Sequence, residues 1–100
     1  MLSQVTMEEL RTELAGPQPP SVIDVREPYE YERGHFDGAE LIPLPALAKE
    51  IHTRHPNREE PVVLYDDLGL RSHHAARLLR ALGYRNVKEI SGGYSGALPS

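Results

Sequence analysis

Short apolar runs alternate with helical segments along the whole chain, and this alternation restricts the fold more than any other feature of the sequence. The run Val62–Tyr65 is apolar throughout, which is typical of a strand buried on both faces of a parallel sheet. We expect strands over residues 21–25, 40–42, 62–65 and 86–90. Strands that alternate with helices predict an α/β fold with three layers, in which helices cover both faces of a mainly parallel central sheet.

Capping residues and helical spacing indicate where the helices lie. Thr6 and Glu9 form a capping-box pattern, in which each side chain accepts a hydrogen bond from the other residue's amide. Pro28 suits the first turn of a short helix. We expect helices over residues 7–15, 28–33, 45–55 and 73–82, with Ser72 as the cap of the last one and a turn at Gly92-Gly93. A chain of 100 residues has the size of one domain, so residues 1–100 are expected to form a single domain.

Charge and hydropathy exclude several classes of partner. The net charge of −4 argues against a nucleic-acid-binding protein, which normally carries a basic stripe. The sequence contains no stretch of about 18 apolar residues, so we expect no membrane span. The first six residues lack the basic start and apolar core of a secretory signal. We therefore expect a cytoplasmic protein with neither a nucleic-acid nor a membrane partner.

The absence of cysteine restricts the chemistry. With no cysteine, the chain has no disulfide, no cysteine-ligated zinc or iron–sulfur cluster, and no thiol nucleophile of its own. His52 and His55 are one helical turn apart, but two surface histidines without a third ligand do not define a metal site. We expect neither a metal nor a cofactor.

The loop that follows the apolar run Val62–Tyr65 is the candidate site, because ligands of parallel sheets bind outside the carboxyl ends of the strands. Gly69 lets the backbone curl so that its amides face inward. The start of the next helix adds free N–H groups, and Arg71 adds a fixed cation. The predicted anion-binding loop consists of Asp66, Asp67, Leu68, Gly69, Leu70, Arg71 and Ser72.

Three separate motifs of the sequence resemble the rhodanese-like domain family. Residues 23–39 resemble its upstream signature, residues 62–72 its active-site strand, loop and helix start, and Gly92-Gly93-Tyr94 its C-terminal signature. The resemblance covers nearly the whole chain. It implies the rhodanese-like fold, and a reaction that moves sulfane sulfur from thiosulfate to cyanide or to a thiol acceptor. It also implies that Asp24 and Arg26 brace the loop.

The chain departs from this family at the nucleophile. The family's loop cysteine carries the sulfur as a persulfide, and it stands directly after the strand, five residues before the arginine. That position is Asp66 in this sequence. A carboxylate forms no stable persulfide, and at about 4 Å its charge opposes a negative donor by roughly 1–4 kcal/mol. We therefore predict a rhodanese-like domain without sulfurtransferase activity, which binds an unknown protein partner or a small anion.

The sequence is compatible with three explanations of Asp66. It is a natural loss of the nucleophile, an engineered mimic of a charged, loaded loop, or a catalytic carboxylate. The corresponding alternative functions are a variant of an active thiosulfate or persulfide sulfurtransferase and a phosphatase-like activity. The family's phosphatase relatives use a loop one residue longer and a thiolate, and aspartyl nucleophiles usually need a second carboxylate and Mg²⁺. The loop length and the missing thiolate both oppose the phosphatase alternative.

Several side-chain positions follow as expectations. The carboxylate of Asp66 is predicted to point into its own loop and accept backbone N–H bonds. Arg71 is predicted to form a salt bridge with Asp66 or with a nearby acid. His35 is predicted to be partly buried and bonded to the backbone. Tyr94 and Leu98 are predicted to pack the C-terminal segment, where the family commonly has a tryptophan.

Overall fold

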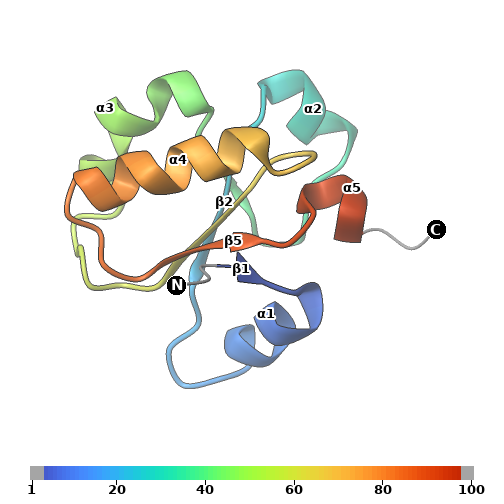
Figure 1. Cartoon of the computed structure of the whole chain (residues 1–100), viewed down its shortest axis with the longest axis horizontal. Helices are drawn as coiled ribbons and strands as arrows, with labels where there is room; N and C mark the ends of the chain where they lie inside the picture. The colour runs from blue at the N-terminus through green and yellow to red at the C-terminus, as the bar shows by residue number, and fades with distance from the viewer. Residues whose placement is uncertain (1–3, 98–100) are drawn as a thin grey trace.

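The computed structural model describes residues 4–97, and they form a five-stranded parallel sheet between helices (Figure 1). The strands are β1 (Gln4–Val5), β2 (Ser21–Asp24), β3 (Glu40–Leu41), β4 (Val62–Tyr65) and β5 (Val87–Ile90). Their order is β1-β5-β4-β2-β3, and every neighbouring pair is parallel. The apolar strand β4 is central and fully buried. The predicted α/β fold with a parallel sheet is confirmed.

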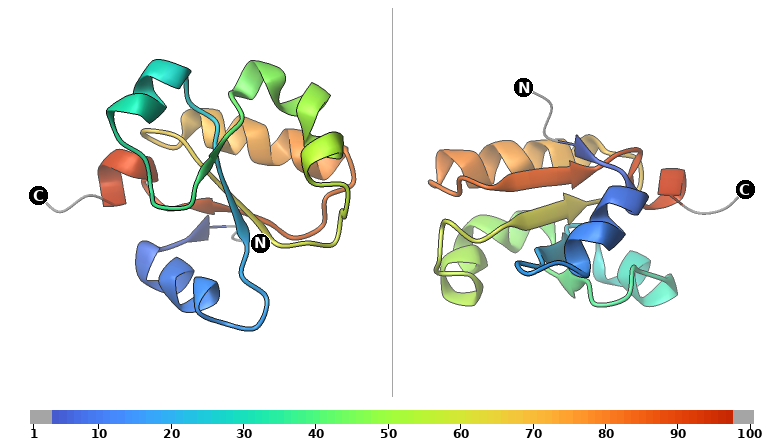
Figure 2. Two further views of the ribbon diagram at one scale, coloured as in Figure 1. Left: turned by 180° about the vertical axis from the view of Figure 1, so that it is seen from behind. Right: turned by 90° about the horizontal axis from the view of Figure 1, so that it is seen from below.

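The helices lie on both faces of this sheet (Figures 1 and 2). They are α1 (Met7–Leu14), α2 (Pro28–Arg33), α3 (Leu44–Arg54), α4 (Leu70–Ala81) and α5 (Gly93–Ala97). Helices α3 and α4 pack against one face, and α1 packs against the other, where Tyr94 of α5 joins it. None of the helices in the described part of the chain combines the length and the apolar character that a membrane crossing requires.

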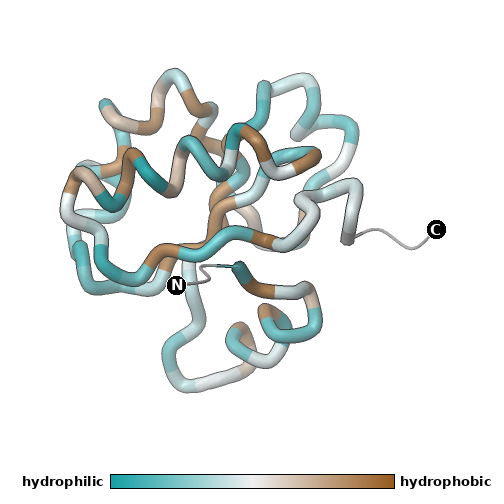
Figure 3. Tube along the Cα trace, viewed as in Figure 1, coloured by the Kyte–Doolittle hydropathy of each residue, from teal (hydrophilic) through white to brown (hydrophobic). Residues whose placement is uncertain are grey.

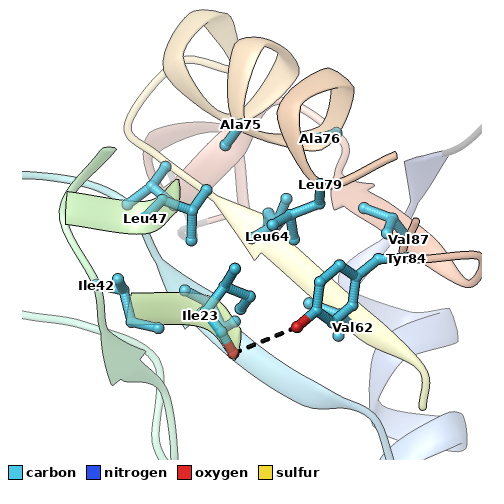
Figure 4. Close-up of a cluster of buried hydrophobic side chains, with 12 residues drawn as sticks. Ile23, Ile42, Leu47, Val62, Leu64, Ala75, Ala76, Leu79, Tyr84 and Val87 are labelled. Atoms are coloured by element: carbon cyan, nitrogen blue, oxygen red, sulfur yellow. Dashed lines mark hydrogen bonds between the residues drawn. The ribbon is translucent and has the colours of Figure 1, made fainter. Parts of the chain in front are cut away.

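Successive residues of the central strands supply two separate cores, because side chains alternate between the faces of a strand. Ile23 and Leu64 point toward α3 and α4, where they pack with Leu47 and Leu79 (Figure 4). In the same core, the hydroxyl of Tyr84 donates to the carbonyl of Ile51 (3.3 Å). The residues that face α1 are Val22, Val63 and Tyr65, in a smaller cluster with Val5, Leu10 and Ile90. The α1 face is thus covered by less helix than the opposite face.

Two predictions near the candidate site were wrong: the residue at which the helix after the loop begins, and the role of Ser72 as its cap. Helix α4 begins at Leu70 rather than after Ser72, and Gly69 is its N-cap residue with a φ of 109°. Ser72 lies buried inside the first turn and caps nothing. The reason is that a carboxylate outside the helix, that of Asp66, accepts the Arg71 amide and replaces the expected serine cap. The expected turn at Gly92-Gly93 leads directly into α5. The predicted packing role of Leu98 falls outside the described residues.

Candidate functional site

The carboxylate of Asp66 fills the loop that joins β4 to α4. Its Oδ1 accepts a hydrogen bond from the Gly69 amide (2.5 Å), and its Oδ2 accepts one from the Arg71 amide (2.6 Å). The hydroxyl of Ser72 lies 3.3 Å from Oδ1. Only 2% of Asp66 is exposed. The prediction that Asp66 points into its own loop is confirmed, and the amides expected to bind an anion already bind this one.

Arg71 fixes the loop to helix α2. Its Nη1 and Nη2 donate to Oε1 and Oε2 of Glu30, at 2.7 and 2.9 Å. Its Nε lies 3.7 Å from Oδ2 of Asp66, so the contact with Asp66 is the longer one. The predicted salt bridge exists, and its main partner is an acid 41 residues away in the chain. Hydrogen bonds from Arg71 lower the pKa of Glu30 from 4.5 to about 2.

Replacing Glu30 by glutamine is expected to reduce the loss in the free energy of unfolding that the chain shows when the pH is lowered. Because the pKa of Glu30 is lowered in the folded state, its ion pair stabilises the fold above pH 4.5. This stability is lost as the pH falls from 4.5 toward about 2. After allowance for solvent screening, we expect Glu30→Gln to cost about 1–2 kcal/mol at neutral pH.

Urea denaturation at neutral pH and near pH 3 measures this effect, since the difference between Glu30→Gln and the unmodified chain should shrink in acid. Glu32→Gln is the matched control, because Glu32 is exposed on the same helix and forms no ion pair within the described residues. An equal difference at both pH values contradicts the assigned role of Glu30.

Asp24 and Arg26 form a buried ion pair beside the loop. The Nη2 of Arg26 lies 2.8 Å from Oδ2 of Asp24, and the two side chains are 4% and 0% exposed. The same Nη2 donates to the carbonyl of Gly34 (2.7 Å). The guanidinium also lies over the ring of Tyr94, 4.5 Å from its centroid. Within the described residues, neither side chain forms a hydrogen bond with the loop. They support it indirectly, through the Tyr94 ring and through Tyr65, the strand residue that pairs with Asp24 and directly precedes the loop.

Helix α5 closes the second side of the loop. The Tyr94 amide donates to the carbonyl of Asp66 (2.7 Å), and the Ser95 amide donates to that of Asp67 (3.1 Å). The Ser95 hydroxyl donates to Oδ1 of Asp67 (2.5 Å). Gly93, at φ 67°, lies so close that a Cβ atom would come within 2.5 Å of the Asp67 carbonyl oxygen. The glycine pair Gly92-Gly93 is therefore the feature of the sequence that indicates the close approach of α5 to the loop. Nothing in the sequence indicates the hydrogen bond of Ser95.

Glu89 is a buried acid that the sequence pattern does not indicate. It lies on β5, and its Oε1 is 3.4 Å from the Ser72 hydroxyl, which also approaches Asp66. Its Oε2 is 3.3 Å from Nδ1 of His73, whose side chain is mostly exposed. A single glutamate in a four-residue strand gives no local sign of its contacts. Ser72 thus stands between two buried carboxylates.

The remaining sequence candidates lie outside this loop. His35 contacts the backbone as predicted, with Nδ1 2.8 Å from the carbonyl oxygen of Tyr31, but it is exposed rather than partly buried. Stacking on the Tyr31 ring keeps His35 at the surface. His74 is also exposed. Within residues 4–97, no three histidine or acidic side chains are arranged to hold a metal ion.

The fold and the loop together define a class of protein. A central parallel strand runs into a loop whose amides face inward and then into a helix, an arrangement that binds an anion at the carboxyl edge of the sheet. The chain belongs to the family of rhodanese-like domains, whose sequence description matches residues 6–98.

Curated relatives and solved structures agree with this family. The chain is 39% identical over 97 residues to the uncharacterized protein YqhL of Bacillus subtilis, covering 94% of this chain and 71% of that protein. It is 35% identical to the thiosulfate sulfurtransferase PspE of Escherichia coli, covering 77% of this chain and 74% of PspE. The human single-domain sulfurtransferase TSTD1 superposes with a TM-score of 0.83 at 27% identity, covering 94% of this chain and 93% of that one.

Proposed function

We propose that this chain is a rhodanese-like domain that does not transfer sulfur and that uses its loop to bind a partner protein. Relatives such as PspE are thiosulfate sulfurtransferases by name. The resemblance implies that their nucleophilic cysteine corresponds to Asp66, and this chain contains no cysteine. A chain without a thiolate lacks the group that would take sulfur from the donor.

The observation that carries this proposal is the hydrogen bonding of Asp66. Its carboxylate accepts the amides of Gly69 and Arg71, which are the donors that a bound anion would need. An incoming anion would have to displace this carboxylate and overcome its charge, so small anions are expected to bind weakly. The partner-protein role is therefore better supported than the small-anion role.

Exposed apolar side chains around the loop support a protein partner. Leu68 and Leu70 are 70% and 81% exposed, and Tyr29 on α2 is 60% exposed. Figure 3 shows the brown segments of this loop at the start of α4. The ion pair between Arg71 and Glu30 holds the loop against α2, so these side chains are presented on a fixed frame. Exposed apolar groups on rigid elements are typical of interaction sites.

A sulfur-transfer assay tests the catalytic half of the proposal. The unmodified chain, supplied with thiosulfate and cyanide, is expected to form thiocyanate no faster than the uncatalysed mixture, because no thiolate is available to accept the sulfur. Thiocyanate formation that rises in proportion to the concentration of the chain contradicts the proposal.

Site-specific photo-crosslinking tests the binding half. A photoreactive amino acid at position 70 is expected to give a discrete crosslinked product in cells of the source organism, and Leu68→Glu is expected to reduce it by about tenfold, as for a hot-spot residue. Position 85 is the control, because Arg85 is exposed on another part of the surface. Identical products from both positions argue against a docking site at the loop.

The cytoplasmic location of the protein stays a prediction.

A further inference from the structure

A pocket lies on the α1 face of the sheet, opposite α3 and α4. It has a volume of about 370 Å³, which falls within the range of small-molecule sites. Its lining combines residues of α1, of β2, of the segment after α2 and of α5: Met7, Leu10, Arg11, Leu14, Val22, His35, Phe36, Asp37 and Tyr94. No part of the predicted site or of the proposed function uses this pocket.

The pocket exists because the α1 face of the sheet is thinly covered. Helix α1 has eight residues, and α5 has five. Figure 1 shows α1 below the sheet and the short α5 at the end of β5, while α2, α3 and α4 lie above the sheet. The floor is apolar and is formed by Val22 of β2 together with Leu10 and Phe36. Leu14, at the outer end of α1, is 40% exposed, so the apolar surface continues to the opening.

The two walls of this pocket carry opposite charges. Arg11 stands on the α1 wall, and Asp37 stands on the wall formed by the segment after α2. Among residues 4–97, neither the Arg11 guanidinium nor the Asp37 carboxylate has an ion-pair partner, so the two groups do not neutralise each other across the pocket. Both charges are therefore available to a ligand.

His35 adds a hydrogen-bond acceptor to the Asp37 wall. Its Nδ1 lies 2.8 Å from the carbonyl oxygen of Tyr31. Because a carbonyl oxygen only accepts, this contact selects the tautomer with the proton on Nδ1, in which Nε2 is an acceptor. Stacking on the Tyr31 ring, at 3.6 Å between centroids, fixes the orientation of the imidazole. One wall thus offers donors through Arg11, and the other offers acceptors.

We infer that this pocket binds a small zwitterion with an apolar body, of the class of free α-amino acids with apolar side chains. The ligand's carboxylate pairs with Arg11, and its ammonium group donates to Asp37 and to His35. Its side chain covers the floor at Val22 and Phe36. A ligand with only one charged group leaves one wall unpaired, which is the basis of the expected selectivity.

Titration of the full chain with three leucine-related probes, followed by NMR, tests this inference. L-leucine is expected to shift the amide signals of residues 35–37 saturably. L-leucinamide, which lacks the carboxylate, and isocaproate, which lacks the ammonium group, are each expected to bind about fivefold more weakly, the effect of one exposed ion pair.

Variants assign each wall to its part of the ligand. Arg11→Gln is expected to weaken leucine binding about fivefold and to leave leucinamide binding unchanged. Asp37→Asn is expected to weaken leucine binding similarly and to leave isocaproate binding unchanged. Arg77→Gln, on α4 across the sheet, is the matched control and should change neither.

Three results would overturn the inference. The first is the absence of saturable shifts in residues 35–37 at the highest soluble concentration of leucine. The second is leucine binding that neither Arg11→Gln nor Asp37→Asn alters. If isocaproate binds as tightly as leucine, the assignment of a zwitterion is wrong, because the Asp37 wall then recognises nothing.

Discussion

Asp66→Cys is expected to turn the chain into a thiosulfate sulfurtransferase that forms thiocyanate at least about 100-fold faster than the mixture containing the unmodified chain, a gain of the size that one well-placed amide donor contributes. Removing the carboxylate frees the amides of Gly69 and Arg71, which already face position 66. The new thiolate attacks the sulfane sulfur of thiosulfate. A sulfur–sulfur bond to the cysteine forms, the bond within thiosulfate breaks, and sulfite leaves with its electron pair. Cyanide then attacks the outer sulfur of the persulfide, so that thiocyanate forms, the sulfur–sulfur bond breaks, and the cysteine thiolate leaves with the electron pair.

Mass spectrometry provides an unambiguous measurement, because the unmodified chain contains no cysteine. After incubation with thiosulfate, Asp66→Cys should gain the mass of one sulfur atom, and cyanide should remove it. Asp66→Ala is one control, since it empties the loop without adding a nucleophile. Asp67→Cys is another, since its thiol stands one residue away, where Ser95 rather than the loop amides is the neighbour. A folded Asp66→Cys variant that gains no sulfur shows that the pocket has lost more than its nucleophile.

Breaking the ion pair between Asp24 and Arg26 is expected to give a large loss of stability, about 3–5 kcal/mol for Asp24→Ala. The substitution leaves the Arg26 guanidinium, which is 4% exposed, without its carboxylate. A buried cation that loses its partner keeps the cost of desolvation and loses the attraction that offset it. Denaturation by urea at neutral pH, monitored by circular dichroism, measures the difference.

Matched variants separate the effect of leaving a buried charge unpaired from the effect of losing an ion pair in general. Glu59→Ala breaks an exposed pair with Arg85 and should cost less than about 1 kcal/mol. Asp24→Asn keeps the shape of the side chain and is expected to fold even where Asp24→Ala does not. The double variant Asp24→Leu/Arg26→Met should lose less stability than Asp24→Ala, because no unpaired charge remains. A loss below about 1 kcal/mol for Asp24→Ala contradicts the structural role of the pair.

Local patterns in the sequence were sufficient to predict most of the helices and strands. The capping box at Thr6 and Glu9 is present, with hydrogen bonds of 2.9 and 3.1 Å between side chains and amides. The apolar run Val62–Tyr65 is the central strand. The inward orientation of Asp66 was also predictable, because its partners, Gly69 and Arg71, lie within five residues of it. Each of these features depends on interactions between residues that are close in the chain.

The sequence by itself determined the alternation of strands and helices, the family, and the absence of a thiol. Only the tertiary structure decided which distant groups meet. The strand β1 has two residues and pairs with β5 at the far end of the chain. Glu30 reaches Arg71 across 41 positions, and Glu89 reaches Ser72 because β5 lies beside β4. Local periodicity sets the conformation of each segment, whereas the order of strands in the sheet sets its neighbours, and no short-range pattern encodes that order.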